Sequence, residues 1–192
     1  MIASPSKAAS SKGTWAGLAR RIRVPLGFVF AAIYLWLADP RWSSIAAGLP
    51  ILLSGIALRG AASGQLRKNT ELATTGPYAY TRNPLYLGSL LIAAGFGIAG
   101  RNPWIGLGIV ALLLGIYYPV ILSEEEYLRT HFTEFEDYRE RVPRLIPRFT
   151  SRGNPGRFSP ELYRKHREYN AIIGSAFLIA ALVGKMWLLH RF

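Results

Sequence analysis

The sequence predicts an all-α integral membrane protein with about five transmembrane helices and a cytoplasmic cofactor-binding face. Hydrophobic residues make up 51% of the 192 residues and charged residues only 18%, against about 25% charged in an average soluble domain. The mean hydropathy is +0.19 although the formal net charge is +12. The apolar residues form long separate runs without the polar stripe of a half-exposed helix. Apolar and charged residues therefore lie in separate blocks, as in membrane helices joined by polar loops.

Five apolar runs are the expected spans, and they cover residues 24–38, 43–57, 84–100, 103–122 and 171–189. A bilayer core of about 30 Å takes about 20 helical residues, with a range of about 17–25. The third, fourth and fifth runs meet this requirement, whereas the first two need their flanks, tilt or local thinning to span. A soluble protein with buried helices is the alternative. The polar Asp39–Trp42 that follows the first run argues against a cleaved signal peptide.

The positions of the basic residues predict the orientation. They concentrate before the first run, in the loop after the second and in residues 129–167; the exceptions are Arg41, Arg101, Lys185 and Arg191. Because basic loops stay on the cytoplasmic side, we expect a cytoplasmic N-terminus and active site, and a C-terminus outside. The distribution accounts for the net charge without nucleic acid. We expect a multi-pass protein of a bacterial inner membrane or the endoplasmic reticulum.

The domain organisation follows from the same blocks. We expect a disordered N-terminal segment over residues 1–19, rich in Ser, Ala and Lys, and one membrane-embedded domain over residues 20–192. The chain has no cysteine, which excludes disulfides, cysteine-ligated metal sites and a thiol nucleophile. The three histidines are too scattered for a histidine-based metal site, so no metal is predicted.

Three motifs lie at the expected cytoplasmic ends of the spans. Gly76–Tyr86 combines a Gly-Pro turn with a proline placed to begin a helix. Ser123–Glu126 ends the fourth run with carboxylates at the unfavourable end of the helix dipole, so they need a function or a partner. Tyr138–Pro147 holds two prolines around an apolar pair and predicts a strap folded back on the surface. The structural alternatives are an entry loop, a solvated helix extension and a clamp over the inner face.

Together and in this order, the motifs resemble those of the isoprenylcysteine carboxyl methyltransferases and their phospholipid methyltransferase relatives. The resemblance rests on R-N-P-L-Y-L-G opening a span, the glutamate run closing the next, and F-x(5)-Y-x(3)-V-P-R-L-I-P, and it covers about residues 60–150. It implies a membrane enzyme that binds S-adenosylmethionine between the inner ends of the spans. Its partners would be membrane lipids and a lipophilic small-molecule or lipidated substrate, with no nucleic acid; an oligomer stays open.

The resemblance also implies roles for individual residues. The implied cofactor-binding residues are Thr70, Glu71, Leu72, Ala73, Tyr78, Asn83, Pro84, Leu85, Tyr86, Glu124 and Glu125. The implied catalytic residues are Arg82, Asn83 and Tyr86. Gln65 matches a family glutamine only if two residues are deleted after it. Methyl transfer from a sulfonium depends mainly on orientation and water exclusion, and orientation alone can supply as much as ~7–11 kcal/mol.

The acceptor side of the site departs from the family pattern. Asn83 replaces the usual histidine, as in phosphatidylethanolamine methyltransferases, and cannot act as an acid or base near neutral pH. Thr133 stands where the family often has glycine. The arginine that prenylcysteine enzymes place before the glutamates has no counterpart in residues 117–122. Arg82, Arg144 and Arg148 are the candidates to bind an anionic head group, since arginine presents a rigid fork to a carboxylate or phosphate; their alternative role is as lipid anchors.

Three functions therefore stay open. The leading hypothesis is O- or N-methylation of a lipid-like head group bearing a carboxylate or an amine. The second is an NADPH-dependent membrane reductase of the sterol or steroid type. The third is a non-catalytic membrane scaffold. The cofactor distinguishes them, because the first binds S-adenosylmethionine, the second NADPH and the third neither.

Overall fold

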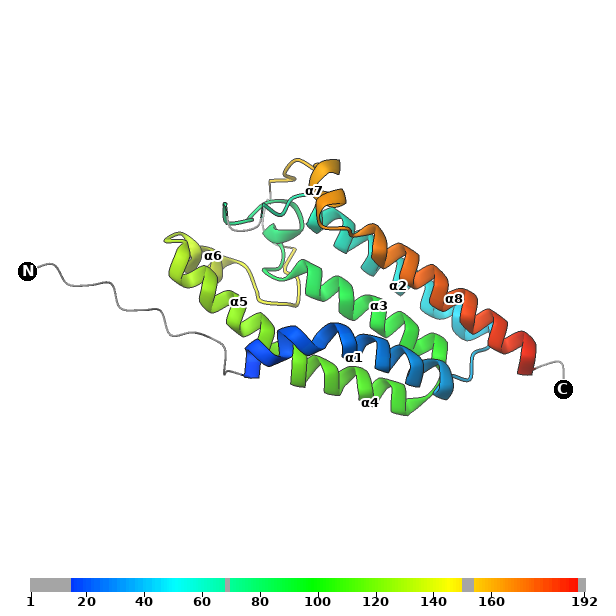
Figure 1. Cartoon of the computed structure of the whole chain (residues 1–192). Coiled ribbons are helices and arrows are strands. Elements are labelled where there is room, and N and C mark those ends of the chain that lie inside the picture. The colour runs from blue at the N-terminus through cyan, green and yellow to red at the C-terminus, as the bar shows by residue number, and fades with distance from the viewer. Residues whose placement is uncertain (1–14, 68–69, 150–153, 190–192) are drawn as a thin grey trace, which may run out of the picture.

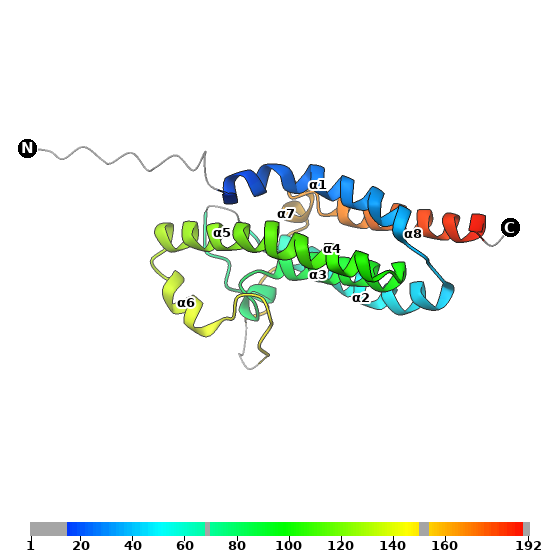
Figure 2. The same cartoon turned by 90° about the horizontal axis from the view of Figure 1, so that it is seen from below.

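A computed structural model describes residues 15–67, 70–149 and 154–189, and within these residues every regular element is helical. The elements are α1 (Trp15–Leu37), α2 (Trp42–Ser63), η2 (Gly76–Ala79), α3 (Pro84–Gly100), α4 (Pro103–Leu112), η3 (Leu113–Tyr117), α5 (Tyr118–His131), α6 (Phe135–Arg141), α7 (Pro160–Lys165) and α8 (Tyr169–Leu189). The long helices run side by side, and the short helices α6 and α7 lie at one end of this bundle (Figures 1 and 2). The predicted all-α class is confirmed.

Three helical stretches are long and apolar enough to cross a bilayer. They are Trp42–Ser63, the continuous stretch Pro103–His131 and Tyr169–Leu188, while Val24–Leu37 and Pro84–Gly100 are shorter apolar helices. The second run was expected to be marginal, but its helix continues through Arg59, whose charge is paired within the protein. The third run is helical over its whole expected length, and its 17 residues are at the lower end of the range for a span. The chain is an integral membrane protein.

The boundary expected at residue 20 falls inside α1, which begins at Trp15. Residues 15–19 are therefore helical, and the rest of the segment expected to be disordered, residues 1–14, lies outside the described residues. This first turn of α1 packs against η3 and α5. The Trp15 indole donates to the Gly115 carbonyl at 2.8 Å, and Ala19 is fully buried beside Ile116 and Val120.

The closest helix pair is α2 with α3, and glycines bring the two backbones together. Gly55 faces Gly88, and Gly48 faces Gly95. A Cβ atom on Gly95 would lie 2.7 Å from the Gly48 carbonyl oxygen and 2.8 Å from Leu52 Cβ, which leaves no room for a side chain. Small residues commonly allow such close contacts between membrane helices. The close packing fixes the position of α3 against α2. The first residue of α3, Pro84, lies at the candidate site.

Polar anchors tie the other helices to this pair. The Tyr34 hydroxyl of α1 donates to the Phe96 carbonyl of α3 at 3.0 Å, and both rings lie in the main core. Lys185 of α8 donates from its Nζ to three carbonyls at the end of α1, at 2.6–2.9 Å. A cation suits the negative end of a helix. The first and last described helices are therefore joined by a charged contact.

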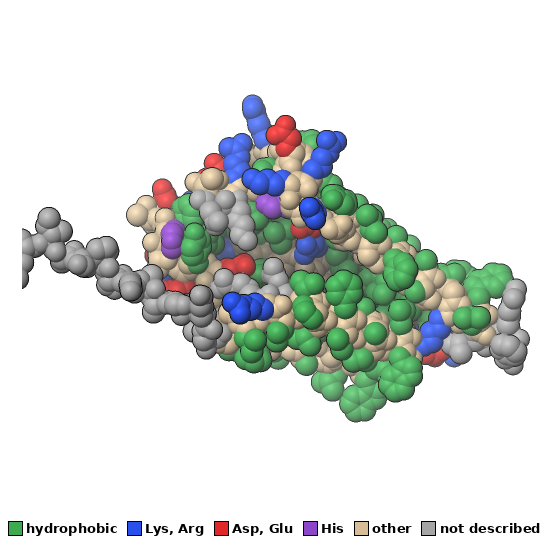
Figure 3. Space-filling view, viewed as in Figure 1, with side chains coloured by type: hydrophobic (Ala, Val, Ile, Leu, Met, Phe, Trp, Pro, Cys, Tyr) green, Lys and Arg blue, Asp and Glu red, His purple; other side chains and the backbone are tan. Residues whose placement is uncertain are grey.

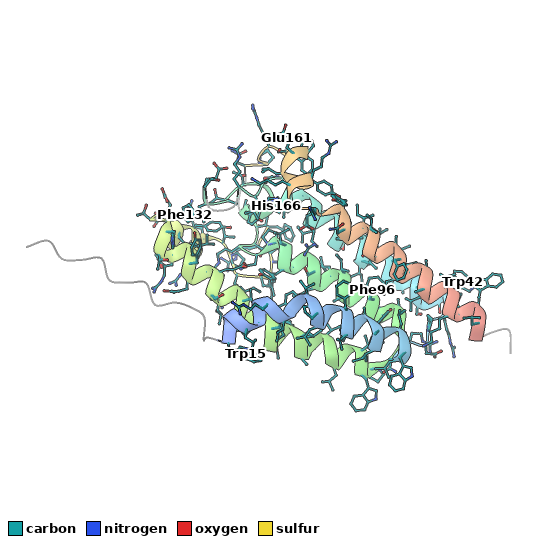
Figure 4. The ribbon with its side chains drawn as sticks, in the orientation of Figure 1. Trp15, Trp42, Phe96, Phe132, Glu161 and His166 are labelled. Carbon is teal, nitrogen blue, oxygen red and sulfur yellow. The ribbon has the colours of Figure 1, made fainter. Side chains whose placement is uncertain are left out.

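The two ends of the bundle differ in polarity. Figure 3 shows Lys, Arg, Asp and Glu side chains gathered around α6 and α7, while hydrophobic side chains cover most of the visible bundle. Glu161 and His166 lie at this polar end and Trp42 lies at the other (Figure 4). α1 begins at the polar end and α8 ends at the opposite one (Figures 1 and 2).

Candidate functional site at the polar end of the bundle

The start of α3 carries Asn83 into contact with α5. Asn83 is the N-cap of this helix, and Pro84 follows at its first position, where the missing N–H is not needed. The Asn83 Nδ2 group donates to Glu125 Oε1 at 3.1 Å and to the Arg144 carbonyl at 3.0 Å. Both amide hydrogens thus have acceptors, and Asn83 is buried. One side chain therefore joins α3, α5 and the segment after α6.

Glu125 is the centre of this cluster. Its side chain is 9% exposed. It accepts hydrogen bonds from Asn83 and from Arg144 Nε at 2.9 Å, and it forms an ion pair with Arg82 Nη2 at 3.5 Å. A buried carboxylate is stable only when it is paired and hydrogen-bonded. The expected need of the glutamate run for a partner is met here by two arginines.

Arg82 has hydrogen-bonding capacity left over. Its side chain is 8% exposed, and its Nε and Nη1 are the buried side-chain atoms of the described residues that lack a hydrogen-bond partner. The guanidinium lies over the Phe135 ring at 6.0 Å. Burial lowers the pKa of Arg82, and nearby Glu125 opposes this shift. Buried donors without a partner are rare in proteins, so Arg82 can donate to two more acceptors than the described residues provide.

Tyr86 and Glu124 form a second contact between α3 and α5. The Tyr86 hydroxyl donates to Glu124 Oε1 at 3.1 Å. The Tyr86 ring packs edge-on against Tyr117, with 5.9 Å between centroids. Both Tyr86 and Glu124 are half-buried. Adjacent glutamates of α5 thus contact α3 through different partners, one buried and one more accessible.

The predicted strap is present and packs on the loop before α3. We define the strap as residues 143–149. The Arg82 N–H donates to the Pro143 carbonyl at 2.9 Å, and the Arg148 N–H donates to the Tyr80 carbonyl at 3.1 Å. Thr81 Oγ1 donates toward the Arg144 and Leu145 carbonyls at 3.2 and 3.1 Å. This segment clamps the loop, in agreement with the structural alternative for the third motif.

Tyr138 of α6 also holds this loop, through the backbone of Tyr78. The Tyr138 hydroxyl donates to the Tyr78 carbonyl at 2.7 Å. Burial raises the pKa of both phenols well above the ordinary value, and for Tyr78 the nearby Tyr138, Glu168 and Glu124 add to the shift. Both hydroxyls therefore stay protonated at physiological pH, and the Tyr138 hydroxyl stays a hydrogen-bond donor.

The described polar contacts of residues 70–73 do not reach this cluster. Thr70 and Glu71 are exposed; Thr70 Oγ1 donates to the Arg67 carbonyl, and Glu71 pairs with Arg67 at 3.4 Å. Leu72 packs against the buried residues of α6, and Ala73 is half-buried. The cofactor role expected of these four residues stays a prediction.

The remaining expected residues occupy different positions. Pro84 is buried, and Leu85 is half-buried with its carbonyl accepting from Arg59 at 3.2 Å. Gln65 packs under Gly76, and its Nε2 donates to the Pro155 carbonyl at 3.4 Å. Arg148 is exposed on the strap.

A hollow of about 200 Å³ adjoins Glu125, and its lining residues are Leu122, Glu125, Glu126, Arg129, Phe135, Arg139 and Arg144. A larger and mostly apolar hollow of about 490 Å³ lies at the other end of the bundle, around Arg101 and Pro103. The hollow beside Glu125 is the one that adjoins the polar cluster, so a ligand could approach the cluster there.

Sequence reasoning missed a half-buried ion pair beside this site. Arg59 of α2 donates from Nε and Nη2 to the carboxylate of Glu168, at 3.0 and 2.8 Å. Arg59 opposes the rise in the Tyr78 pKa while Glu168 adds to it, so the pair lies within electrostatic reach of Tyr78. Figure 3 shows the surface hollowed below α7 with acidic and basic side chains in its wall. The sequence signal for this pair was Arg59, a charged residue in the same helix as the second apolar run.

The family comparison matches this part of the chain. Residues 51–134 match the phospholipid methyltransferase family model. This segment is therefore similar to the phospholipid methyltransferases. It includes Asn83, Tyr86, Glu124 and Glu125, while the strap lies beyond it.

Three curated proteins are similar to the chain. It is 36% identical over 110 residues to the nickel-cobalt-cadmium resistance protein NccN of Alcaligenes xylosoxydans xylosoxydans, covering 57% of this chain and 46% of that protein. It is 34% identical over 141 residues to the cobalt-zinc-cadmium resistance protein CzcN of Cupriavidus metallidurans, covering 67% and 62%. It is 32% identical over 120 residues to the protein-S-isoprenylcysteine O-methyltransferase of Rattus norvegicus, covering 55% and 42%.

The chain thus matches less than two thirds of the length of each relative. No solved structure matches it. The resemblance to methyltransferases read from the three motifs is confirmed at the level of the family.

Proposed function

We propose that the chain is a membrane methyltransferase that binds S-adenosylmethionine at the polar end of the bundle and methylates a lipophilic acceptor. The observation that carries this proposal is the buried cluster of Asn83, Arg82 and Glu125, next to the contact of Tyr86 with Glu124. Both lie where α3 begins and α5 passes it, inside the family segment. Membership in a methyltransferase family supports the reaction type.

The residues present fit the groups of the cofactor. S-adenosylmethionine carries a carboxylate, and Arg82 holds two buried donors without a partner. The cofactor also carries ribose hydroxyls and a sulfonium charge, and the half-buried Glu124 offers carboxylate oxygens to either. When bound, the cofactor would supply an electrophilic methyl group. The chain would hold it in place and exclude water, which is the main contribution that this reaction requires.

For the acceptor we propose a lipid-like molecule whose head group bears a carboxylate or an amine. Arg144 supports an acidic group, because its side chain is 37% exposed and lines the hollow beside Glu125. Its Nε contacts Glu125, and its Nη1 donates to the Tyr118 hydroxyl at 3.1 Å. The guanidinium is therefore oriented before any acceptor arrives.

We also propose that the polar end faces the cytoplasm. The basic residues of 129–167 lie on α5, α6, α7 and their connections. α1 begins at this end and α8 ends at the other, which agrees with an N-terminus inside and a C-terminus outside. In this orientation a water-soluble cofactor reaches the site from the cytoplasm, and a membrane-dissolved acceptor reaches it from the bilayer.

The experiment is a calorimetric titration of the detergent-purified protein with S-adenosylhomocysteine and, in parallel, with NADPH. We expect micromolar binding of S-adenosylhomocysteine and none of NADPH. Binding of NADPH alone would replace the proposal with a membrane reductase. Binding of neither ligand to folded protein would favour the scaffold.

A further inference from the structure

The strap exposes two large apolar side chains. Ile146 is 80% exposed and Phe149 is 78% exposed, although neither belongs to a helix of the bundle. Pro143 and Pro147 restrict the backbone around Ile146. The Phe149 ring also contacts the Tyr80 ring at a tilt, with 5.6 Å between centroids. The strap therefore presents these side chains outward from a held backbone.

The hydrogen bonds of the strap set its depth along the bundle. Its ends bond to the backbone of Tyr80 and Arg82, and Pro84 begins the apolar helix α3 only two residues later. The residues just before an apolar membrane helix lie in the interfacial region of a bilayer. A segment bonded side by side to these residues lies at the same level. The strap is thus placed at the membrane surface and not above it.

The charge on the strap suits a lipid surface. Arg148 is exposed between Ile146 and Phe149 in the sequence. Apolar side chains beside arginines are the combination that binds at the boundary between head groups and acyl chains, because the apolar groups enter it and the cations contact lipid phosphates.

We propose that the strap is a membrane contact. Ile146 and Phe149 enter the head-group region of the leaflet at the polar end of the bundle, and Arg148 binds lipid phosphate there. The Arg144 carbonyl in this strap accepts from Asn83 Nδ2. The lipid surface therefore supports the segment that positions Asn83, and the site opens beside the head groups. This contact is independent of methyl transfer, since it concerns the surface of the strap alone.

The test uses the absence of cysteine from the sequence. An Ile146→Cys variant is labelled with a nitrobenzoxadiazole fluorophore and placed in vesicles of phosphatidylcholine mixed with phosphatidylglycerol. Two matched variants serve as references: Glu161→Cys on α7, at the polar end (Figure 4), for water, and Leu107→Cys on α4, 58% exposed on the bundle, for lipid. Quenching is measured with doxyl-labelled lipid and with aqueous iodide.

We expect the label at position 146 to emit at shorter wavelength than the label at 161. It should be quenched several-fold more by doxyl lipid and less by iodide. A label that behaves like the one at 161 would overturn the proposal. A label shielded from both quenchers would also overturn it, because a protein surface and not lipid would then cover the strap.

A second variant tests the arginine. In the Ile146→Cys background, Arg148→Gln should reduce the response of the emission to phosphatidylglycerol and to added salt, which screens such contacts. An unchanged response would remove Arg148 from the contact. Neither readout requires a cofactor or turnover, so failure here is distinguishable from failure of the proposed function.

Discussion

Asn83 and Glu125 lie 42 residues apart in the sequence, and the amide of one donates to the carboxylate of the other at 3.1 Å. The same amide also donates to the Arg144 carbonyl. The beginning of α3, the middle of α5 and the strap therefore meet at one side chain. A change at Asn83 should disturb all three.

Replacing Asn83 by aspartate removes both donated hydrogen bonds and sets a second carboxylate against Glu125. We expect the variant to be less stable by about 1–3 kcal/mol, the cost of leaving buried polar groups unpaired. The deficit should shrink as the pH falls, because protonation of one carboxyl of the pair relieves the repulsion. Thermal unfolding in detergent at several pH values measures it. Asn83→His keeps a donor and is the matched variant; an Asn83→Asp protein as stable as the original would contradict the geometry.

Glu125 and Glu126 are neighbours with different surroundings. Glu125→Gln removes the charge that compensates Arg82 and Arg144, so we expect a loss of about 3 kcal/mol in stability together with weaker S-adenosylhomocysteine binding. Glu126 is exposed and pairs with Arg129, so Glu126→Gln should stay within about 0.5 kcal/mol. Chemical unfolding and calorimetry compare the two. Equal losses would show that burial does not set the role of Glu125.

Tyr86→Phe removes one hydroxyl and keeps the ring on Tyr117. We expect the affinity for S-adenosylhomocysteine to fall about tenfold, or about 1.4 kcal/mol, because Glu124 loses the donor that orients it. The free energy of unfolding should change by about 1 kcal/mol or less. Tyr127→Phe is the control, since Tyr127 is exposed on the same helix as Glu124. Unchanged affinity in a folded Tyr86→Phe protein would remove this contact from the cofactor site.

Tyr138 predicts a stability that falls at alkaline pH. Its pKa is raised in the folded protein by burial, so above about pH 10 the unfolded chain loses this proton while the folded protein keeps it. The stabilising contribution is therefore complete below about pH 10 and decreases as the pH rises further. Tyr138→Phe should flatten this decrease and cost about 1 kcal/mol at neutral pH through the lost bond to Tyr78. Unfolding measured from about pH 8 to about pH 11 tests both, and identical slopes would exclude Tyr138 as the cause.

Lys185→Met should weaken the attachment of α8 to α1. Three carbonyls at the end of α1 lose a charged donor, and we expect a loss of about 2 kcal/mol or more. Lys165→Met on α7 is the control, because Lys165 is exposed. Proteolysis after heating reports release of α8 separately from global unfolding. Equal protection in the two variants would contradict the contact.

The helices were predictable because each rests on a local property of the sequence. The apolar runs indicated the spans, and Pro84 and Pro103 stand at helix starts as proline prefers. The extension of α2 beyond its apolar run was not predictable, since it depends on the pairing of Arg59 with a residue 109 positions away. The wider helical turn at η3 precedes Pro119, which lacks the N–H that would bond to the Gly115 carbonyl four residues earlier.

The candidate site was predictable as a set of motifs but not as a set of contacts. The motifs indicated that the start of α3, the glutamates and the strap belong together. The separate partners of Glu124 and Glu125 follow from the rotation of α5 against α3, which residue spacing does not specify. Residues 70–73 were expected at the site from the family resemblance alone. Such a resemblance gives no information on whether a side chain faces the cluster.

The contact of Lys185 with the end of α1 has a consequence for how the chain enters the membrane. Lys185 is the one charged residue of the apolar helix α8. Without it, apolar packing against the neighbouring helices would allow α8 several positions along the membrane normal. Seating one ammonium group on three carbonyls defines a single height. The receiving carbonyls become available only once α1 has formed and ended. We therefore expect the last segment to be inserted loosely and to reach its final register against the first, which makes their meeting the closing step of assembly.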